Sequence, residues 1–263
     1  MRKIDFWCLK HKLLAFILLT LALTGCGGVI FYALSAPVWF LAVYAVITVL
    51  INLIYVNFSY AGGVQEAIKD FNNCNPYPLF ELAEKILPYV KGTGEQDLIL
   101  NKTSSLFWMG EHKKMLTILQ NLNIDRISGT PLQSKIVYYN NLMCAYQKCG
   151  MNDEAMAVNK KIKMLFNDAP QKVRETYKGI IVSSKVFELE ADGRYEEALK
   201  ISLERPENDL LQKVSAAMER AELFISLKEY EKAKTQLKFV YMNGNKTYYV
   251  QKAQDMYNEL EAL

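Results

Sequence analysis

Apolar residues are concentrated in one uninterrupted stretch near the start of the chain. Residues 13–65 contain no Asp, Glu, Lys or Arg. A single helix of that length would run about 80 Å, far beyond the roughly 30 Å of a membrane hydrocarbon core. Two helices fit better, because Pro37 lacks the amide proton that a continuing helix needs. The pattern therefore predicts two membrane-spanning helices, at about residues 13–34 and 38–58, with the turn at Ser35, Ala36 and Pro37.

Small and charged residues add two expectations about this hairpin. Gly25, Gly27 and Gly28 are interpreted as small residues that let the two helices approach closely. Basic residues precede the first span and none lies between the spans, so the positive-inside rule places residues 1–12 in the cytoplasm. Two crossings return the rest of the chain to the same side, which predicts a multi-pass protein of a bacterial plasma membrane. The basic residues concerned are Arg2, Lys3, Lys10 and Lys12.

Cys26 supports a competing interpretation of the N-terminal segment. A basic start, an apolar run and the sequence Leu-Thr-Gly-Cys ending at Cys26 resemble the processing site of bacterial lipoproteins, where the cysteine becomes lipidated. Lipoproteins usually continue from that cysteine into a polar tether, whereas here residues 29–56 are again apolar. Lipidation of Cys26 therefore stays open as an alternative to the two-span hairpin.

The rest of the chain has the 3.6-residue apolar period of amphipathic helices. Residues 61–94 read as a helical connector, and residues 95–263 as a series of helix pairs joined by tight turns. Successive turns begin 40, 43 and 35 residues apart, a spacing typical of stacked helical hairpins. Each turn is followed about five residues later by Ala or Met. The turns begin at Gly110, Gly150, Gly193 and Lys228, and the later residues are Met115, Ala155, Ala198 and Ala233.

Local chemistry explains these turns and the ends of the helices. Glycine at the start of a turn adopts the left-handed conformation that closes a helix. A small residue on the next helix lets the two helices pack closely. Pro131, Pro170 and Pro206 each stand where a first helix should begin, and Thr247 is expected to cap a final helix that ends near Leu260 and covers the end of the array.

These turns and stripes resemble the tetratricopeptide repeat family over roughly residues 95–244. The early aromatic residue of that family is matched by Tyr139 in one copy, but by other residue types in the rest, and the spacings exceed the family's 34 residues. Related helical-repeat types therefore stay open. The resemblance implies an all-α fold, namely a solenoid of about four to five helix pairs with a C-terminal capping helix.

The same resemblance implies a binding scaffold without catalysis. In such proteins the first helices of the repeats line a groove that holds a peptide or a helix of a partner protein. Mapped onto this chain, the partner-binding groove includes Phe107, Asn140, Gln147, Phe187 and Glu222. The competing interpretation of each residue is ordinary surface or packing between repeats.

Composition excludes several other classes of function. The net charge of +3 comes from the N-terminal tail, and the downstream domain is formally neutral, so no basic patch suggests nucleic-acid binding. Only two histidines are present, and no glycine-rich phosphate loop lies outside the apolar stretch, which leaves little material for a metal site or a catalytic triad. We therefore expect no enzyme activity, no cofactor, no metal and no small-molecule substrate.

The sequence thus predicts a membrane-anchored cytoplasmic scaffold or adaptor that binds a protein or peptide. The first alternative is a structural accessory subunit of a larger membrane complex, with spans that pack against other membrane helices. The second alternative is a lipoprotein processed at Cys26. The identity of the partner has no signature in the sequence.

Overall fold

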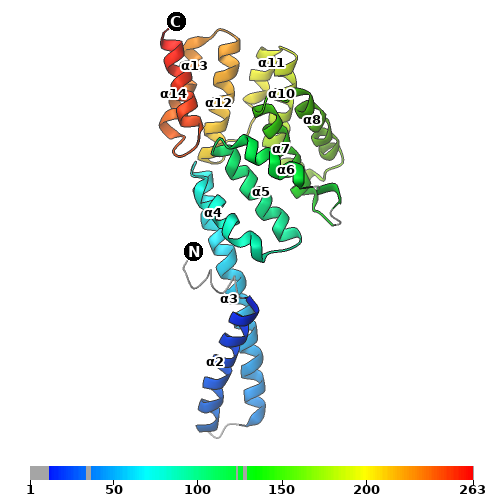
Figure 1. Ribbon diagram of the computed structural model, residues 1–263, viewed down its shortest axis with the longest axis vertical. Helices are drawn as coiled ribbons and strands as arrows, with labels where there is room; N and C mark the ends of the chain where they lie inside the picture. The colour runs from blue at the N-terminus through cyan, green and yellow to red at the C-terminus, as the bar shows by residue number, and fades with distance from the viewer. Residues whose placement is uncertain (1–11, 34–36, 123, 127–128, 263) are drawn as a thin grey trace. The chain divides into compact units, whose positions relative to one another are not determined.

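The described part of the chain is built from α-helices (Figure 1). The structure, a computed structural model, describes residues 12–33, 37–122, 124–126 and 129–262, and no strand occurs among them. The predicted all-α fold class is therefore confirmed. The chain divides into two compact units, residues 1–68 and residues 69–263.

Most of the helices follow one another through short connections. In chain order the α-helices are α2 (Lys12–Ala33), α3 (Val38–Asn72), α4 (Tyr77–Ile86), α5 (Thr93–Trp108), α6 (His112–Asn121), α7 (Leu132–Lys148), α8 (Asn152–Asn167), α9 (Gln171–Thr176), α10 (Lys178–Ala191), α11 (Tyr195–Ser202), α12 (Leu210–Ser226), α13 (Tyr230–Asn243) and α14 (Tyr249–Glu261). Two single-turn 3-10 helices are η1 (Leu87–Tyr89) and η2 (Ile124–Arg126).

The first unit contains helices close to the predicted ones. Helix α2 matches the first expected helix, whereas α3 continues well past residue 58 to Asn72, because no proline interrupts it and Gly62 and Gly63 are tolerated inside it. The predicted turn at Ser35 and Ala36 lies outside the described residues, as does the tail up to residue 11. A search of the described residues finds no helix with both the length and the apolar character needed to span a bilayer.

One of the three glycines in α2 makes the expected close approach. A Cβ atom built on Gly27 would lie 2.1 Å from Cε1 of Tyr44 in α3, so only glycine fits there without a shift of the ring. The Tyr44 hydroxyl donates a hydrogen bond to the carbonyl oxygen of Leu23 at 3.0 Å. No described atom lies within 4 Å of a Cβ built on Gly25 or Gly28, so the described contacts do not require glycine at these two positions.

Four turns in the second unit share one backbone conformation. Gly110, Gly150, Gly193 and Lys228 all have φ between 61° and 80°, the left-handed region. In each turn this residue donates its N–H to the carbonyl three residues back, and the next residue donates to the carbonyl five residues back. This pair of bonds is a common way to close a helix, and the next helix begins immediately after it. The predicted turns are therefore present at all four positions.

The residues that follow the turns are buried as the sequence predicted. Met115, Ala155, Ala198 and Ala233 are each 0% exposed. Each donates its N–H to the carbonyl oxygen of the residue just before its helix, so all four have the same position in the first turn. Small or flexible side chains at this position let neighbouring helices pack closely.

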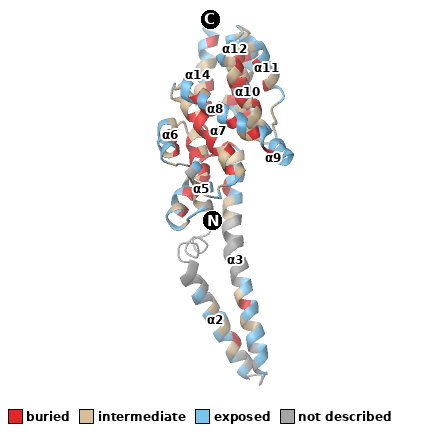
Figure 2. Cartoon of the chain, turned by 90° about the vertical axis from the view of Figure 1, so that its right-hand side faces the viewer, coloured by how far each residue is buried: buried red, intermediate tan, exposed pale blue. Residues whose placement is uncertain are grey.

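Helices that follow one another in the chain also pack against one another. The contacts run from α4 and α5 through α7 and α8 to α13 and α14. Figure 2 shows buried positions along α7, α10 and α12. One core cluster gathers α5 to α8 around Met115, Ile136 and Ile162, and a second gathers α12 to α14 around Val214 and Leu237.

The two ends of the second unit meet through main-chain hydrogen bonds. In the connection between α13 and α14, Lys246 donates its N–H to the carbonyl oxygen of Cys74 at 3.0 Å, and Tyr248 donates to that of Trp108 at 2.9 Å. The Asn245 side chain donates to the carbonyl oxygen of Asn73. The C-terminal helix pair therefore packs against the start of the same unit.

Two predicted helix starts are wrong in detail. Helix α12 begins at Leu210, four residues after Pro206, and the Asp209 carboxylate caps it by accepting the N–H of Gln212 at 2.8 Å. A capping carboxylate determines this start more strongly than a proline in the preceding loop. Thr247 does not cap α14, because its hydroxyl is buried and donates to the carbonyl oxygen of Gly244.

Alanine at the turn glycines is expected to destabilise the second unit. Gly193→Ala should lower the free energy of unfolding by about 1 to 2 kcal/mol, the usual cost of a left-handed residue that carries a Cβ atom. Gly110→Ala should cost more, because its Cβ would also lie 3.1 Å from Cβ of Tyr248. Denaturant unfolding followed by circular dichroism measures both changes.

Gly179→Ala is the matched control for this comparison. It also adds a methyl group to open space, but in the first turn of α10 and without a positive φ, so stability should stay the same or rise. Equal losses at Gly179 and Gly193 would contradict the backbone explanation.

Candidate functional site

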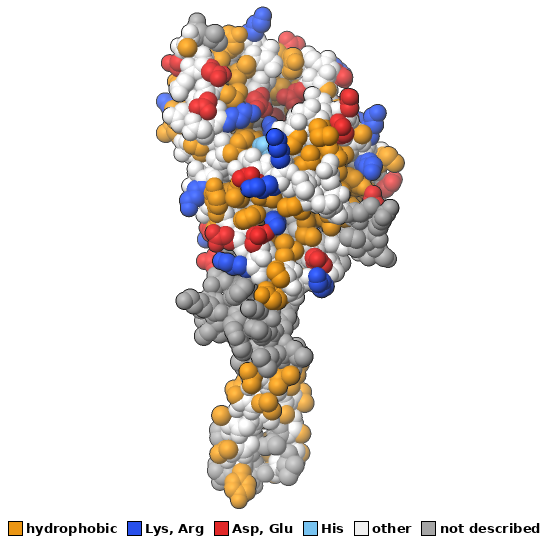
Figure 3. Space-filling view, in the orientation of Figure 1, with side chains coloured by type: hydrophobic (Ala, Val, Ile, Leu, Met, Phe, Trp, Pro, Cys, Tyr) orange, Lys and Arg blue, Asp and Glu red, His pale blue; other side chains and the backbone are white. Residues whose placement is uncertain are grey.

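One cavity brings together all five residues that the sequence assigned to a groove. It has a volume of about 300 Å³ and lies among α5, α7, α10 and α12 of the second unit. Phe107 comes from α5, Asn140 and Gln147 from α7, Phe187 from α10 and Glu222 from α12. Figure 3 shows a hollow on one face of this unit with acidic side chains inside it and basic side chains at its edge.

The two predicted phenylalanines line the cavity and also pack in the core. Phe187 is only 7% exposed and belongs to a core cluster. The Phe107 ring makes edge contacts with Trp108 and Tyr248, at centroid distances of 5.3 and 6.1 Å. The groove and packing interpretations therefore both apply to these rings, which form a rigid apolar wall.

The two predicted amides on α7 have free hydrogen-bonding capacity. Within the described part of the chain, the side chains of Asn140 and Gln147 make no hydrogen bond, although both line the cavity. Their neighbour Asn141 differs, because it is buried and donates to oxygens of Leu100, Thr103 and Ser104. The amides of Asn140 and Gln147 can therefore donate to and accept from a bound molecule.

Three carboxylates line the cavity, and two of them have cationic partners. Glu219 accepts from Arg205 at 3.1 Å, and Glu222 accepts from Lys252 at 2.5 Å. The side chain of Glu190 has no hydrogen bond or ion pair among the described residues, and the same holds for the side chain of Lys148 on the neighbouring α7. One acidic and one basic side chain in the lining are thus left without a direct partner.

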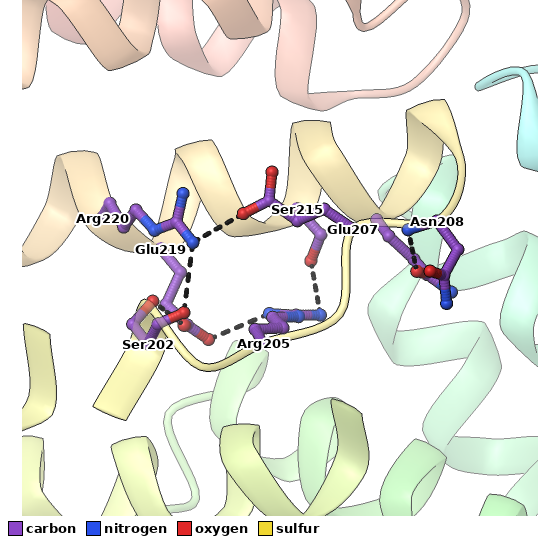
Figure 4. A network of polar contacts seen from close by, with 8 residues as sticks. Ser202, Arg205, Glu207, Asn208, Ser215, Glu219 and Arg220 are labelled. Atoms are coloured by element: carbon purple, nitrogen blue, oxygen red, sulfur yellow. Dashed lines mark hydrogen bonds and ion pairs between the residues drawn. The ribbon is translucent and has the colours of Figure 1, made fainter. Parts of the chain in front are cut away.

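The connection between α11 and α12 holds one wall of the cavity in place (Figure 4). Arg205 bridges Glu219 and Ser215, and Ser202 donates to the other oxygen of Glu219 at 2.6 Å. Arg220 donates to the carbonyl oxygen of Ser202 as well as to a carboxylate of the connection. Because these ion pairs are largely shielded from water, they fix the loop more firmly than surface pairs would.

The environment of Glu190 perturbs its ionisation. Burial, followed by the negative charges of Glu219 and Glu222, raises the pKa of Glu190 from 4.5 to about 7, although Lys148 acts in the opposite direction. A carboxylate in a cavity with a strongly raised pKa is a common feature of functional sites. Glu190 therefore changes its charge close to neutral pH.

Several lining residues were missed by the sequence interpretation, and helical spacing could have identified two of them. Glu190 lies three residues after Phe187, and Glu219 lies three residues before Glu222, so each shares a helix face with a predicted residue. Lys148 follows Gln147 directly. Arg205 had no such signal, because it lies in the connection between α11 and α12, where helical spacing does not apply.

Cys26, the candidate lipidation site, lies in the other unit. It is an exposed residue within α2, and its thiol forms no disulfide with a described cysteine. Among the described residues, no group of three His, Cys, Asp or Glu side chains has a geometry suited to a metal ion.

Comparison with protein-family models, with curated proteins and with solved structures finds no match to this chain.

The raised pKa of Glu190 predicts a pH-dependent stability. The folded protein keeps the proton up to about pH 7, whereas the unfolded chain releases it near 4.5, so stability falls as the pH rises between these values. Glu190→Gln is neutral at every pH. At pH 8 it should be more stable than the natural protein by roughly 3 kcal/mol, and at pH 4 the two should be alike.

Denaturant unfolding at the two pH values tests this expectation. Glu196→Gln, an exposed position on α11, is the control and should change stability little at either pH. A stability difference for Glu190→Gln that is the same at pH 4 and pH 8 would show that Glu190 titrates normally.

Proposed function

We propose that the chain is a membrane-anchored, non-catalytic scaffold whose helical domain binds a segment of a partner protein in the central cavity. The observation that carries this proposal is the convergence of Phe107, Asn140, Gln147, Phe187 and Glu222 on one cavity. These residues come from four helices, and the resemblance to helical-repeat proteins assigns all five to one groove. Ordinary surface residues on four helices would not be expected to share one hollow.

The lining has the composition that peptide recognition requires. Apolar rings offer contact area, the free amides of Asn140 and Gln147 can bond a peptide main chain, and charged residues add selectivity. Phe107 and Phe187 are already held by packing, so little ordering is required when a ligand binds.

Repeat architecture is the finer part of the proposal. Four turns of the same conformation, spaced by 35 to 43 residues, support a tetratricopeptide-like or related solenoid of four to five helix pairs. In this arrangement α14 caps the last pair. Its Leu260 and Ala253 are buried, and Met256 packs against the same cluster.

Membrane attachment is proposed for the first unit. Many of its described apolar side chains are exposed, including Leu21, Val29 and Trp39 at 61% or more, and such a surface needs a lipid or protein cover. The proposal concerns the whole of residues 13–58, part of which lies outside the described side chains. The basic residues before Leu13 support a cytoplasmic location of the helical domain in this proposal.

Anchoring would act through local concentration. A cavity held at the bilayer meets membrane-associated partners at a higher effective concentration than a freely diffusing one. The scaffold would thereby favour assembly at the membrane without catalysing any reaction.

Selection from a library of displayed random decapeptides tests the binding function. The full chain in detergent micelles, immobilised by a C-terminal tag, should enrich peptides that compete with one another for one site. Replacing both Asn140 and Gln147 with alanine should weaken binding of the selected peptides roughly thirtyfold, because each of the two lost hydrogen bonds contributes about 1 kcal/mol. Fluorescence anisotropy measures the affinities.

Gln133→Ala is the matched control for the amide variants. Gln133 is also on α7 but is exposed and outside the cavity, so its replacement should leave the affinities unchanged. Failure to enrich any peptide, or peptides that bind the double variant normally, would reject the cavity as a peptide site.

Protease protection tests the anchor. In intact cells a tag after Leu263 should be shielded until the membrane is opened, and Cys26→Ala should leave size and membrane association unchanged. Cleavage of the tag from outside would overturn the proposed topology. A change of size in the Cys26→Ala variant would favour the lipoprotein alternative, and loss of the protein from washed membranes would favour a protein cover for the first unit.

A further inference from the structure

The carboxylates that line the cavity differ in whether they have a cationic partner. Glu219 and Glu222 are paired with Arg205 and Lys252, so each of these carboxylates is locally neutralised. Glu190 has no direct partner in the described part of the chain, although it lines the same cavity. A group of a bound molecule could therefore serve as the partner of Glu190.

A cation fits this position better than an anion. The lining has three carboxylates, on Glu190, Glu219 and Glu222, but only two basic side chains, so its negative charges outnumber its positive ones when Glu190 is ionised and a cation beside Glu190 would be attracted. An anion beside Lys148 would instead be repelled by them. The field inside the cavity therefore favours a positive group.

An organic cation fits better than a metal ion. The cavity carboxylates do not form a metal-binding group among the described residues. Phe187 precedes Glu190 by one helical turn, so the lining offers an apolar ring and a carboxylate on the same face of α10. Lys and Arg side chains have this combination, an apolar stem that ends in a cationic head.

We infer that the cavity takes the lysine or arginine side chain of a bound peptide and pairs its cationic head with Glu190. The inference rests on the proposed function and specifies the chemistry of the partner segment. In this arrangement the stem lies along Phe187, and Asn140 and Gln147 bond the main chain on either side.

The charged groups around Glu190 make this pairing sensitive to pH. Below pH 7 Glu190 is mainly neutral and attracts a cation weakly, and above pH 7 it is mainly charged. Binding of a basic peptide should therefore tighten as the pH rises. The charged groups that face Glu190 are Lys148 on α7 and, on α12, Glu219 and Glu222 with their partners Arg205 and Lys252.

Charged groups on the other neighbouring helices have partners of their own or are exposed to solvent. Lys163 of α8 pairs with Glu188, and Glu197 of α11 pairs with Arg194. The charged side chains of α9 are exposed, namely Lys172, Arg174 and Glu175.

Displayed decapeptides selected on the full chain in detergent micelles test the inference. Lys or Arg should be enriched at one position of the selected peptides beside an apolar residue. Replacing that residue with norleucine, which keeps the stem and removes the charge, should weaken binding on the order of tenfold. The affinity of the basic peptide should rise up to about tenfold from pH 6 to pH 8, and that of the norleucine peptide should stay constant.

Glu190→Gln should remove both the preference for the basic peptide and its pH dependence, while the norleucine peptide binds as before. Glu196→Gln, on the exposed face of α11, should behave as the natural protein. Unfolding measurements on both variants confirm that each is folded.

The possible failures separate the two proposals. If no peptide is enriched, the proposed function fails and the inference fails with it. If peptides are enriched without a basic residue, or if Glu190→Gln keeps the preference, peptide binding stands and the inference about charge is overturned. Enrichment of Asp or Glu would overturn it in favour of Lys148 as the anchoring residue.

Discussion

The main-chain contact between the two ends of the helical unit is the constraint on which the rest depends. Trp108 and Cys74 accept N–H groups from the connection before α14, which lies far away in sequence. Tyr249, the residue after the Tyr248 donor, is 6% exposed and lines the cavity, so this contact also positions part of the cavity lining. Gly110 lies against Tyr248 at the same place, where a larger residue would force the two ends apart.

Features set by local chemistry could be predicted from the sequence. The turns at Gly110, Gly150 and Gly193 were predictable because a left-handed residue is a requirement of the backbone itself. The resemblance to helical repeats assigned Phe107 and Asn140 to one groove, and both line the same cavity. The turn at Lys228 was predictable from its spacing of 35 residues after Gly193, although a residue other than glycine is unfavourable in the left-handed conformation.

Features set by distant contacts could not be predicted in the same way. The closure of the unit joins residues that are up to 172 positions apart, and no periodic pattern records it. The raised pKa of Glu190 depends on carboxylates of another helix, so its chemistry is visible only after α10 and α12 have packed. The predicted start of α12 at Pro206 is wrong because the capping side chain of Asp209 begins the helix later in the chain. The two membrane spans remain a proposal based on sequence.

The closure also fixes how many helix pairs the unit can contain. An open array of repeats can gain or lose a pair by duplication or deletion, because each repeat touches only its neighbours. Here an inserted pair would move the connection before α14 away from Trp108 and Cys74, breaking both hydrogen bonds and opening the cavity at Tyr249. Selection would therefore act against the gain or loss of helices in this unit, and variation among descendants of this sequence should accumulate as substitutions within a constant set of helices.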